Sequence, residues 1–249
     1  MTDALGSRMV FGVLVPSTNT AVQPEYDSMR PPGVTNHISR IIIPNNPVNS
    51  DADFSQLMND IRGATMAAVD AIVTCEPDAL IMGMSAETFW DGVDGANTLQ
   101  DKLQTAAGGR KVTMASDACQ AALRCYDGVK RVAVITPYMP VGDAQVHRFF
   151  TECGFDVSVV HGLRCSSPTA IANVSEASLR DAILAVDGPN VDAIVQVGTN
   201  LAMARLAAVA EEWLGKPVLA INTATYWHAL RSHGIGDRVG GYGSLLERF

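Results

Sequence analysis

Four short turns of this sequence carry residue types that could bind a small anion. They are residues 16–19 (PSTN), 83–85 (GMS), 136–138 (TPY) and 198–200 (GTN), and each follows a short apolar run. Such runs predict buried strands of parallel sheets, and ligands of these sheets bind beyond the carboxyl ends of the strands. Exposed N–H groups at turns and helix N-termini favour anions. We therefore expect the four turns to meet in one cleft that binds a small carboxylate.

A single turn of this kind does not define a site. Ser, Thr and Asn after a strand are also ordinary helix N-caps. Gly83 and Gly198 allow close approach of a ligand to the backbone, but glycine also simply eases a turn from strand to helix. The two glycines stand at equivalent points of an internal repeat. That repetition favours a binding cleft between two similar halves.

The scaffold that must position these turns follows from the order of the apolar segments. Runs at 9–16, 79–84, 131–135 and 193–197 predict strands, and segments such as 53–73, with apolar residues at helical spacing, predict helices between them. Strands that alternate with helices form parallel sheets with helices on both faces. The predicted fold class is α/β.

The same order of elements occurs twice. VFGVLVPS matches RVAVITPY, DALIMGMS matches DAIVQVGTN, and KVTMASDACQAALR matches KPVLAINTATYWHALR. We predict two pseudo-symmetric halves, each a parallel sheet with helices on both faces, and an active site in the cleft between them. The first half spans residues 1–115 and is completed by 225–249, and the second half spans 116–224.

Composition restricts the partners of the protein. Of the 249 residues 47% are hydrophobic and 18% charged, which suits a packed core. The net charge of −8 argues against nucleic acid and anionic membranes as partners. No apolar run approaches the roughly 20 residues of a membrane span, and the N-terminus lacks the pattern of a signal peptide. Five cysteines without CxxC spacing indicate free thiols, so we expect a cytoplasmic protein.

Motifs for cofactors are missing from the sequence. It holds no phosphate-binding loop, no GxGxxG, no HExxH and no cluster of two histidines with a carboxylate. We therefore expect neither a nucleotide cofactor nor a metal ion.

Several segments together resemble a known family. GVLVPSTNTAVQPEY, TPYMP and the terminal GYGSLL are similar to the maleate isomerase and arylmalonate decarboxylase branch of the aspartate/glutamate racemase superfamily. The resemblance extends over nearly the whole chain and implies two pseudo-symmetric α/β halves around a central site. It also implies that Asn19 and Tyr138 hold substrate carboxylates, that the loop around Pro168 closes over the substrate, and that the protein forms a homo-oligomer.

The sequence departs from this family at its cysteines. In the family a cysteine at each pseudo-symmetric strand end transfers the proton or adds to the substrate. By the resemblance the first position falls on Gly83 and the second at or beside Gly198, and arylmalonate decarboxylases also have glycine at the first. None of the five cysteines of this chain matches either position. Thiolate addition and two-base proton transfer therefore cannot run here as they do in the relatives.

Four residues are candidates to replace the cysteines. Glu87 follows the first glycine and lies beside aromatic residues that would raise its pKa, so it is the leading proton carrier, although it would equally suit a solvated or capping position. Asp117 would serve equally as a helix cap, and His228 as a packed or surface residue. Cys119, near a helix N-terminus, would be either activated there or buried and structural.

These observations predict a cofactor-independent enzyme that acts next to the carboxylate of a small carboxylate or dicarboxylate, as a lyase similar to arylmalonate decarboxylases. Two alternatives stay open. One is a maleate cis–trans isomerase with a relocated nucleophile such as Cys119, and the other is a carboxylate-binding homologue without catalysis. The predicted catalytic residues are Glu87, Ser85 and Tyr138, and the predicted substrate-binding residues are Ser17, Asn19, Gly83, Met84, Pro168, Gly198, Thr199 and Asn200.

Overall fold

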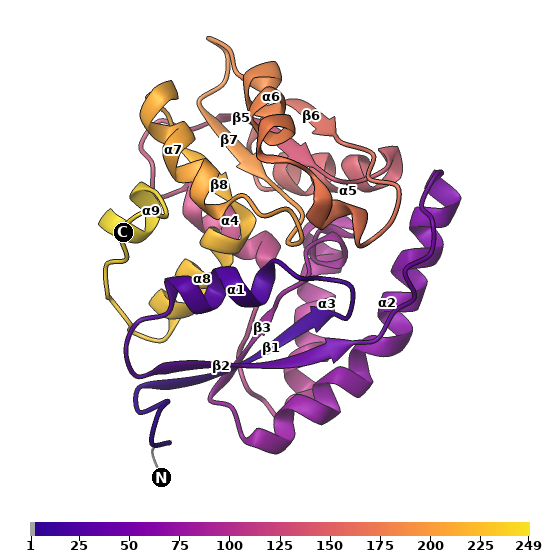
Figure 1. Ribbon diagram of the computed structural model, residues 1–249, viewed down its shortest axis with the longest axis vertical. Helices are drawn as coiled ribbons and strands as arrows, with labels where there is room; N and C mark the ends of the chain where they lie inside the picture. Colours follow the sequence, from indigo (N-terminus) through magenta and orange to yellow (C-terminus); the bar gives the residue numbers. More distant parts are fainter. Residues whose placement is uncertain (1–2) are drawn as a thin grey trace.

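Two parallel sheets of four strands each form the centres of two similar halves (Figure 1). The structure is a computed structural model that describes residues 3–249. In the first sheet the order is β2-β1-β3-β4 and in the second it is β6-β5-β7-β8. This repeated order confirms the predicted fold of two pseudo-symmetric α/β halves. The strands are β1 (Met9–Pro16), β2 (Val34–Ile41), β3 (Ala79–Met82), β4 (Val112–Thr113), β5 (Arg131–Thr136), β6 (Asp156–Gly162), β7 (Ala193–Gln196) and β8 (Val218–Ala220).

Burial explains why the inner strands have the sequences they do. Every residue of β1 and of β3 is buried, because helices cover both faces of the sheet and each of these two strands has another strand on either side. The edge strand β6 has one neighbour, and its residues are all exposed or half-buried. The apolar runs that predicted strands are therefore those of the central strands.

Helices fill the connections between the strands. In Figure 1, α1 and α8 lie on the side of the first sheet that faces the second half, and α2 runs along its other side. No helix within residues 3–249 is both long and apolar enough to cross a membrane. The α-helices are α1 (Val22–Met29), α2 (Asp51–Ile72), α3 (Gly92–Ala106), α4 (Ala115–Leu123), α5 (Pro140–Glu152), α6 (Glu176–Val186), α7 (Ala204–Leu214), α8 (Ile221–Ser232) and α9 (Ser244–Arg248), and the short 3₁₀ helices are η1 (Val73–Cys75), η2 (Ala86–Phe89) and η3 (Ala170–Asn173).

The helix α2 shows how local sequence sets an element that later borders the site. It begins after Ser50, whose hydroxyl accepts the N–H of Asp53 at 3.2 Å and so caps a free donor. Phe54, Met58 and Ile61 are buried at helical spacing and form one apolar stripe. The stripe holds the first turns of α2 against the centre of the molecule.

The helices α4 and α8 join the two halves. Each follows the last strand of its sheet, and the two helices pack on each other. The helix α8 also packs against α1, β3 and β4 of the first half. The exact division into 1–115 with 225–249 and 116–224 stays a prediction.

Three elements differ from the sequence-based expectation. The helix α1 was not expected, because its sequence VQPEYDSM contains a proline and few apolar residues. Proline is nevertheless tolerated in a first helical turn, where its missing N–H costs nothing. The sequence predicts a short helix over 98–107, whereas α3 begins at Gly92, since its glycines are poor helix formers that hide the start. The sequence also predicts a strand over 111–115, whereas β4 has only two residues.

Phe89 of η2 should be a main support of the contact between the halves. Its ring is fully buried. The centroid of this ring lies 5.1 Å from that of Phe149 and 5.7 Å from that of Phe150, both on α5. Phe89→Ala should lower the free energy of unfolding by about 3–5 kcal/mol, because it leaves a cavity in this cluster. Urea denaturation measures the change. Leu184→Ala is the control: its side chain is 57% exposed, so a change within about 0.5 kcal/mol is expected. Equal effects of both variants would contradict the role of Phe89.

Candidate active site

A small cavity of about 70 Å³ lies where the four turns meet. One side of it is apolar and is formed by α2 together with Ile171 of η3. The other side is polar and comes from both halves of the molecule. The apolar side consists of Phe54, Leu57, Met58, Ile61 and Ile171, and the polar groups come from Thr18, Asn19, Ser85, Tyr138, Thr199 and Asn200. The lining is completed by Pro16, Ile43, Met84, Ala86, Pro137, Pro168 and Gly198.

A chain of hydrogen bonds crosses the cleft through the polar side. The hydroxyls of Ser85 and Tyr138 lie 2.6 Å apart. The N–H of Thr199 donates to Ser85 Oγ at 3.1 Å, and the Thr199 hydroxyl donates to the carbonyl of Gly83 at 3.2 Å. Asn19 Nδ2 donates to the same Thr199 hydroxyl at 3.2 Å. Residues of the first half thus alternate with residues of the second half along this chain.

The hydroxyl pair can supply one proton donor to a ligand. Burial raises the pKa of Tyr138 above its ordinary value of 10, although the bond to Ser85 lowers it, so the phenol stays protonated. Only one of the two hydroxyl protons is used in the bond between Ser85 and Tyr138. The other proton is available to an oxygen in the cavity. A carboxylate is a strong acceptor for such a donor.

Backbone groups add further donors at the same place. The N–H groups of Ser85, Ala86 and Asn200 make no hydrogen bond to any other group within residues 3–249, although all three residues line the cavity. Unpaired N–H groups in a buried site are costly unless a ligand or water binds them. The polar side of the cavity therefore suits an anion.

A loop of the second half closes the cavity from outside. Asn200 Nδ2 donates to the carbonyl of Pro168 at 3.0 Å, and the N–H of Thr169 donates to Asn45 Oδ1 at 3.0 Å. Pro168 and Ile171 line the cavity. The loop is thereby fastened to both halves, at Asn45 of the first and at Asn200 of the second.

The structure brings most of the predicted site residues to the cavity. Ser17 is not among the residues that line it: its hydroxyl accepts the N–H of Ile43 at 3.1 Å and so holds Ile43 at the cavity wall. Gly83 lies behind the lining, where its carbonyl accepts the Thr199 hydroxyl. The predicted residues that line the cavity are Asn19, Met84, Ser85, Tyr138, Pro168, Gly198, Thr199 and Asn200.

Glu87 is not brought to the cavity. Its carboxylate accepts Arg62 Nε at 2.5 Å and borders a separate surface groove beside Trp90. Successive residues of a 3₁₀ helix point about 120° apart, so Ala86 faces the cavity while Glu87 turns toward α2. Burial does raise the pKa of Glu87, with Arg62 acting in the opposite direction. The raised pKa was expected, but the direction of the side chain was not visible in the sequence.

The other candidates for a proton carrier or nucleophile also lie elsewhere. Cys119 is fully buried, and burial raises the pKa of its thiol well above the ordinary value. Burial raises the pKa of Asp117 and lowers the pKa of His228. Within residues 3–249 the cavity lining contains no cysteine, histidine, aspartate or glutamate, and no three such residues gather anywhere as a possible metal site. The hydroxyls of Ser85 and Tyr138 are therefore the leading acidic groups of the lining.

The backbone is adapted to glycine where the family resemblance expects cysteine. Gly198 has a φ of +117°, and a Cβ there would lie 2.5 Å from Pro137 Cδ. A side chain at this position would be strained by its backbone angles and would collide with the proline. At Gly83 a Cβ would meet Val15 Cγ2 at 3.0 Å, which the neighbours could relieve only by moving.

The comparison with known proteins identifies the family. The family model for arylmalonate decarboxylase matches residues 11–246. The chain belongs to the arylmalonate decarboxylase family. Its sequence is 26% identical over 257 residues to the maleate isomerase of Pseudomonas putida, covering 95% of this chain and 96% of that protein. It is 27% identical to the maleate isomerase of Nocardia farcinica, covering 98% of this chain and 97% of that protein.

Solved structures show the same fold. A mutant of the Nocardia farcinica maleate cis–trans isomerase with a covalently bound succinylcysteine intermediate superposes with a TM-score of 0.86 at 24% identity, covering 97% of this chain and 99% of that chain. An arylmalonate decarboxylase superposes with a TM-score of 0.76 at 22% identity, covering 95% and 98%. Members of the family are thus isomerases and decarboxylases with one common fold.

Sequence reasoning missed the apolar wall of the cavity. Phe54, Leu57, Met58 and Ile61 recur at the spacing of an ordinary helix stripe, and a stripe that packs on a core has the same pattern as one that lines a pocket. Asn45, which holds the closing loop, lies in a segment without any motif. No local signal in the sequence separates these residues from structural ones.

The burial of Cys119 predicts its protection in the native protein. After treatment with iodoacetamide at neutral pH, Cys119 should stay unmodified while the exposed Cys75 is alkylated, because only an accessible thiolate reacts. Mass spectrometry of tryptic peptides measures both sites. The control is the urea-denatured protein, in which both should react. Alkylation of Cys119 at the rate of Cys75 in the native protein would show that the thiol is accessible.

Proposed function

We propose that the protein is a cofactor-independent decarboxylase of malonates that carry an apolar substituent. The observation that supports this most directly is the division of the cavity into an apolar side, formed by α2, and a polar side rich in hydroxyl and N–H donors. A substituted malonate has the matching chemistry, with an apolar group and two carboxylates on one carbon. Membership of the arylmalonate decarboxylase family supports the same reaction class.

The two sides would have different tasks. One carboxylate lies among the polar groups and accepts hydrogen bonds from the Ser85–Tyr138 pair and from free backbone N–H groups. The other carboxylate faces the apolar side, where loss of hydration favours its departure as neutral CO₂. The carbon–carbon bond breaks, and its electron pair moves onto the remaining carboxylate as an enediolate. Donors already in place stabilise this charge as it develops.

The product needs a proton on the carbon that lost CO₂. We assign this proton to the hydroxyl pair of Ser85 and Tyr138, since both residues line the cavity and Tyr138 stays protonated through its raised pKa. The enediolate is basic enough at carbon to accept the proton, and water then returns a proton to the pair. Glu87 has no part in this scheme, because its carboxylate is paired with Arg62 outside the cavity.

Maleate cis–trans isomerisation is the second candidate. The similarity to maleate isomerases over nearly the full chain favours it. Thiolate addition to a double bond needs an accessible sulfur. The cavity lining within residues 3–249 holds none, so this route needs a nucleophile of another kind.

Carboxylate binding without turnover is the third reading, supported by the same lack of a strong acid or nucleophile.

Proton NMR in D₂O separates the three readings. The pure protein is incubated with phenylmalonate, methylmalonate and maleate. Decarboxylation converts phenylmalonate to phenylacetate with one deuterium on the reacting carbon. Conversion of maleate to fumarate would instead identify an isomerase. Line broadening of a diacid without any product would identify a binding protein, and would exclude decarboxylation of that compound.

Substitutions in the hydroxyl pair should reduce turnover strongly. Ser85→Ala and Tyr138→Phe should each lower kcat/KM for phenylmalonate by about 10²–10³, the effect of removing one donor to a developing oxyanion. Tyr126→Phe is the matched control, because its hydroxyl bonds Ser244 at 2.7 Å, remote from the cavity lining. Glu87→Gln should also keep turnover within a few-fold of the parent. Loss of turnover in Glu87→Gln with retained binding would make Glu87 the proton carrier.

A further inference from the structure

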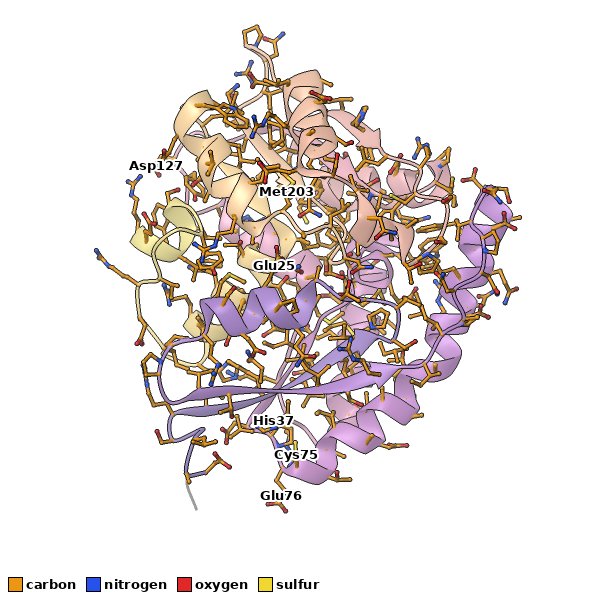
Figure 2. All side chains as sticks on the ribbon, in the orientation of Figure 1. Glu25, His37, Cys75, Glu76, Asp127 and Met203 are labelled. Carbon is orange, nitrogen blue, oxygen red and sulfur yellow. The ribbon has the colours of Figure 1, made fainter. Side chains whose placement is uncertain are left out.

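Glu25 carries a partly buried carboxylate that reaches from the first half to the second. It lies on α1, and Figure 2 shows it turned toward the start of α7, where Met203 is found. Glu25 Oε1 accepts the N–H of Ala204, the first residue of α7, at 3.0 Å. Glu25 Oε2 accepts Asn222 Nδ2, on the first turn of α8, at 2.6 Å. Glu25 thus binds two helices of the second half at once.

The position suits a carboxylate. The first N–H groups of a helix lack partners within the helix, and the helix dipole favours negative charge at this end. Burial raises the pKa of Glu25, while the hydrogen bonds from Asn222 and Ala204 lower it. The charge is therefore held by donors of the second half, although the residue belongs to the first.

Asn222 passes this contact on to the candidate site. Its Nδ2 group donates both to Glu25 Oε2 and to the carbonyl of Thr199, the latter at 2.9 Å. Both partners are acceptors, so only the NH₂ side of the amide can face them. Asn222 Oδ1 is buried and has no partner within residues 3–249. The two acceptors, and not a bond to Oδ1, determine how the amide is turned.

The start of α1 and the residues just before it hold the turn after β7 at two places. Before α1 begins, Asn19 donates to the Thr199 hydroxyl, and the N–H of Thr20 donates to Asn200 Oδ1 at 2.9 Å. Farther along α1, Glu25 binds the start of α7 and, through Asn222, the Thr199 carbonyl. These contacts come from residues 19–25, which include the first turn of α1, so together they fix both the position and the direction of the turn after β7.

We propose that Glu25 is a positioning residue for the active site. Through Asn222 it orients Thr199, so that the Thr199 N–H meets Ser85 Oγ and leaves the Ser85–Tyr138 pair in place for the substrate. Glu25 touches neither the cavity nor the reacting atoms. The effect of Glu25 on turnover rests on the proposed decarboxylation. Its effect on the orientation of Thr199 does not.

Glu25→Gln tests this role with little change of shape. A glutamine has one acceptor oxygen where the carboxylate has two, so its NH₂ group must face either Asn222 Nδ2 or the Ala204 N–H, and the remaining bond loses its charge. Asn222 is then held less firmly, and the Thr199 carbonyl loses or weakens its bond to the Asn222 donor. In the protein without ligand, amide hydrogen exchange at Thr199 and Ala204 should become at least about tenfold faster, since each lost charged hydrogen bond opens the site locally. Exchange is measured by NMR or by mass spectrometry of fragments.

Glu211→Gln is the matched control. Glu211 is likewise a partly buried glutamate with a pKa raised by burial, it lies on α7, and it accepts the N–H and the hydroxyl of Ser244 at 2.7 and 3.0 Å. Loss of the Glu211 carboxylate should speed amide hydrogen exchange at Ser244 and leave the exchange rate at Thr199 unchanged. If Glu25→Gln speeds exchange evenly over the whole chain, or no more at Thr199 than Glu211→Gln does, Glu25 only stabilises the fold and the proposal fails.

A double variant separates positioning from simple bonding. Glu25→Gln with Asn222→Asp restores a donor–acceptor pair between α1 and α8, but it places a carboxylate against the Thr199 carbonyl. We expect the free energy of unfolding to recover relative to Glu25→Gln while exchange at Thr199 stays fast. Recovery of slow exchange at Thr199 would overturn the relay through Asn222.

Turnover supplies the last test. With phenylmalonate, Glu25→Gln should lower kcat about tenfold with a smaller change in KM, and Glu211→Gln should change neither. An unchanged kcat in Glu25→Gln, with fast exchange at Thr199, would confine the role of Glu25 to the turn itself and overturn its role in the reaction. If the parent protein does not turn over phenylmalonate, the proposed function fails, and hydrogen exchange alone still decides whether Glu25 orients Thr199.

Discussion

The three hydrogen bonds of Thr199 inside the cleft are the interactions on which the site depends. Its N–H binds Ser85, its hydroxyl donates to Gly83, and the same hydroxyl accepts from Asn19. All three partners belong to the first half, whereas Thr199 follows β7 of the second. The two sheets could each form without these bonds. At this residue the turns after β1, β3 and β7 meet beside the cavity.

The chemistry of the cavity follows from this meeting of polar turns with an apolar helix. Buried polar groups need partners, and the turns satisfy many of theirs across the cleft, which leaves a hydroxyl proton and a few N–H groups for a ligand. The apolar stripe of α2 lines the same cavity. In the proposed reaction, fixed dipoles would stabilise the developing charge without a thiol. Gly198 and Gly83 leave little room for a side chain beside these turns.

The pseudo-symmetry of the fold does not extend to the details of the site. The sheets have the same strand order, and equivalent helices α4 and α8 pack together. Yet Tyr138 of the second half lines the cavity and its hydroxyl meets that of Ser85, while at the matching turn of the first half Ser17 binds the backbone of Ile43. The closing loop comes from the second half and the apolar wall from the first. Each half thus supplies different groups from similar elements.

The sequence by itself determined the architecture and predicted the cleft in which the strand-end turns meet. Strand and helix periodicities are local, and the internal repeat shows that the same unit occurs twice, so two parallel sheets with strand-end turns in one cleft could be predicted. Ser85, Tyr138, Thr199 and Asn200 were found in this way because chemistry at strand ends is also local.

Only the tertiary structure decided which side chains face the cavity. Glu87 follows Ala86 by one residue, and the rotation of about 120° between successive residues of a 3₁₀ helix directs it to Arg62 and away from the cavity. The apolar wall of α2 and the contact of Glu25 with Asn222 join segments far apart in the chain. The direction of a side chain after a short turn, and the partner it meets there, depend on packing between distant elements, which no local pattern encodes.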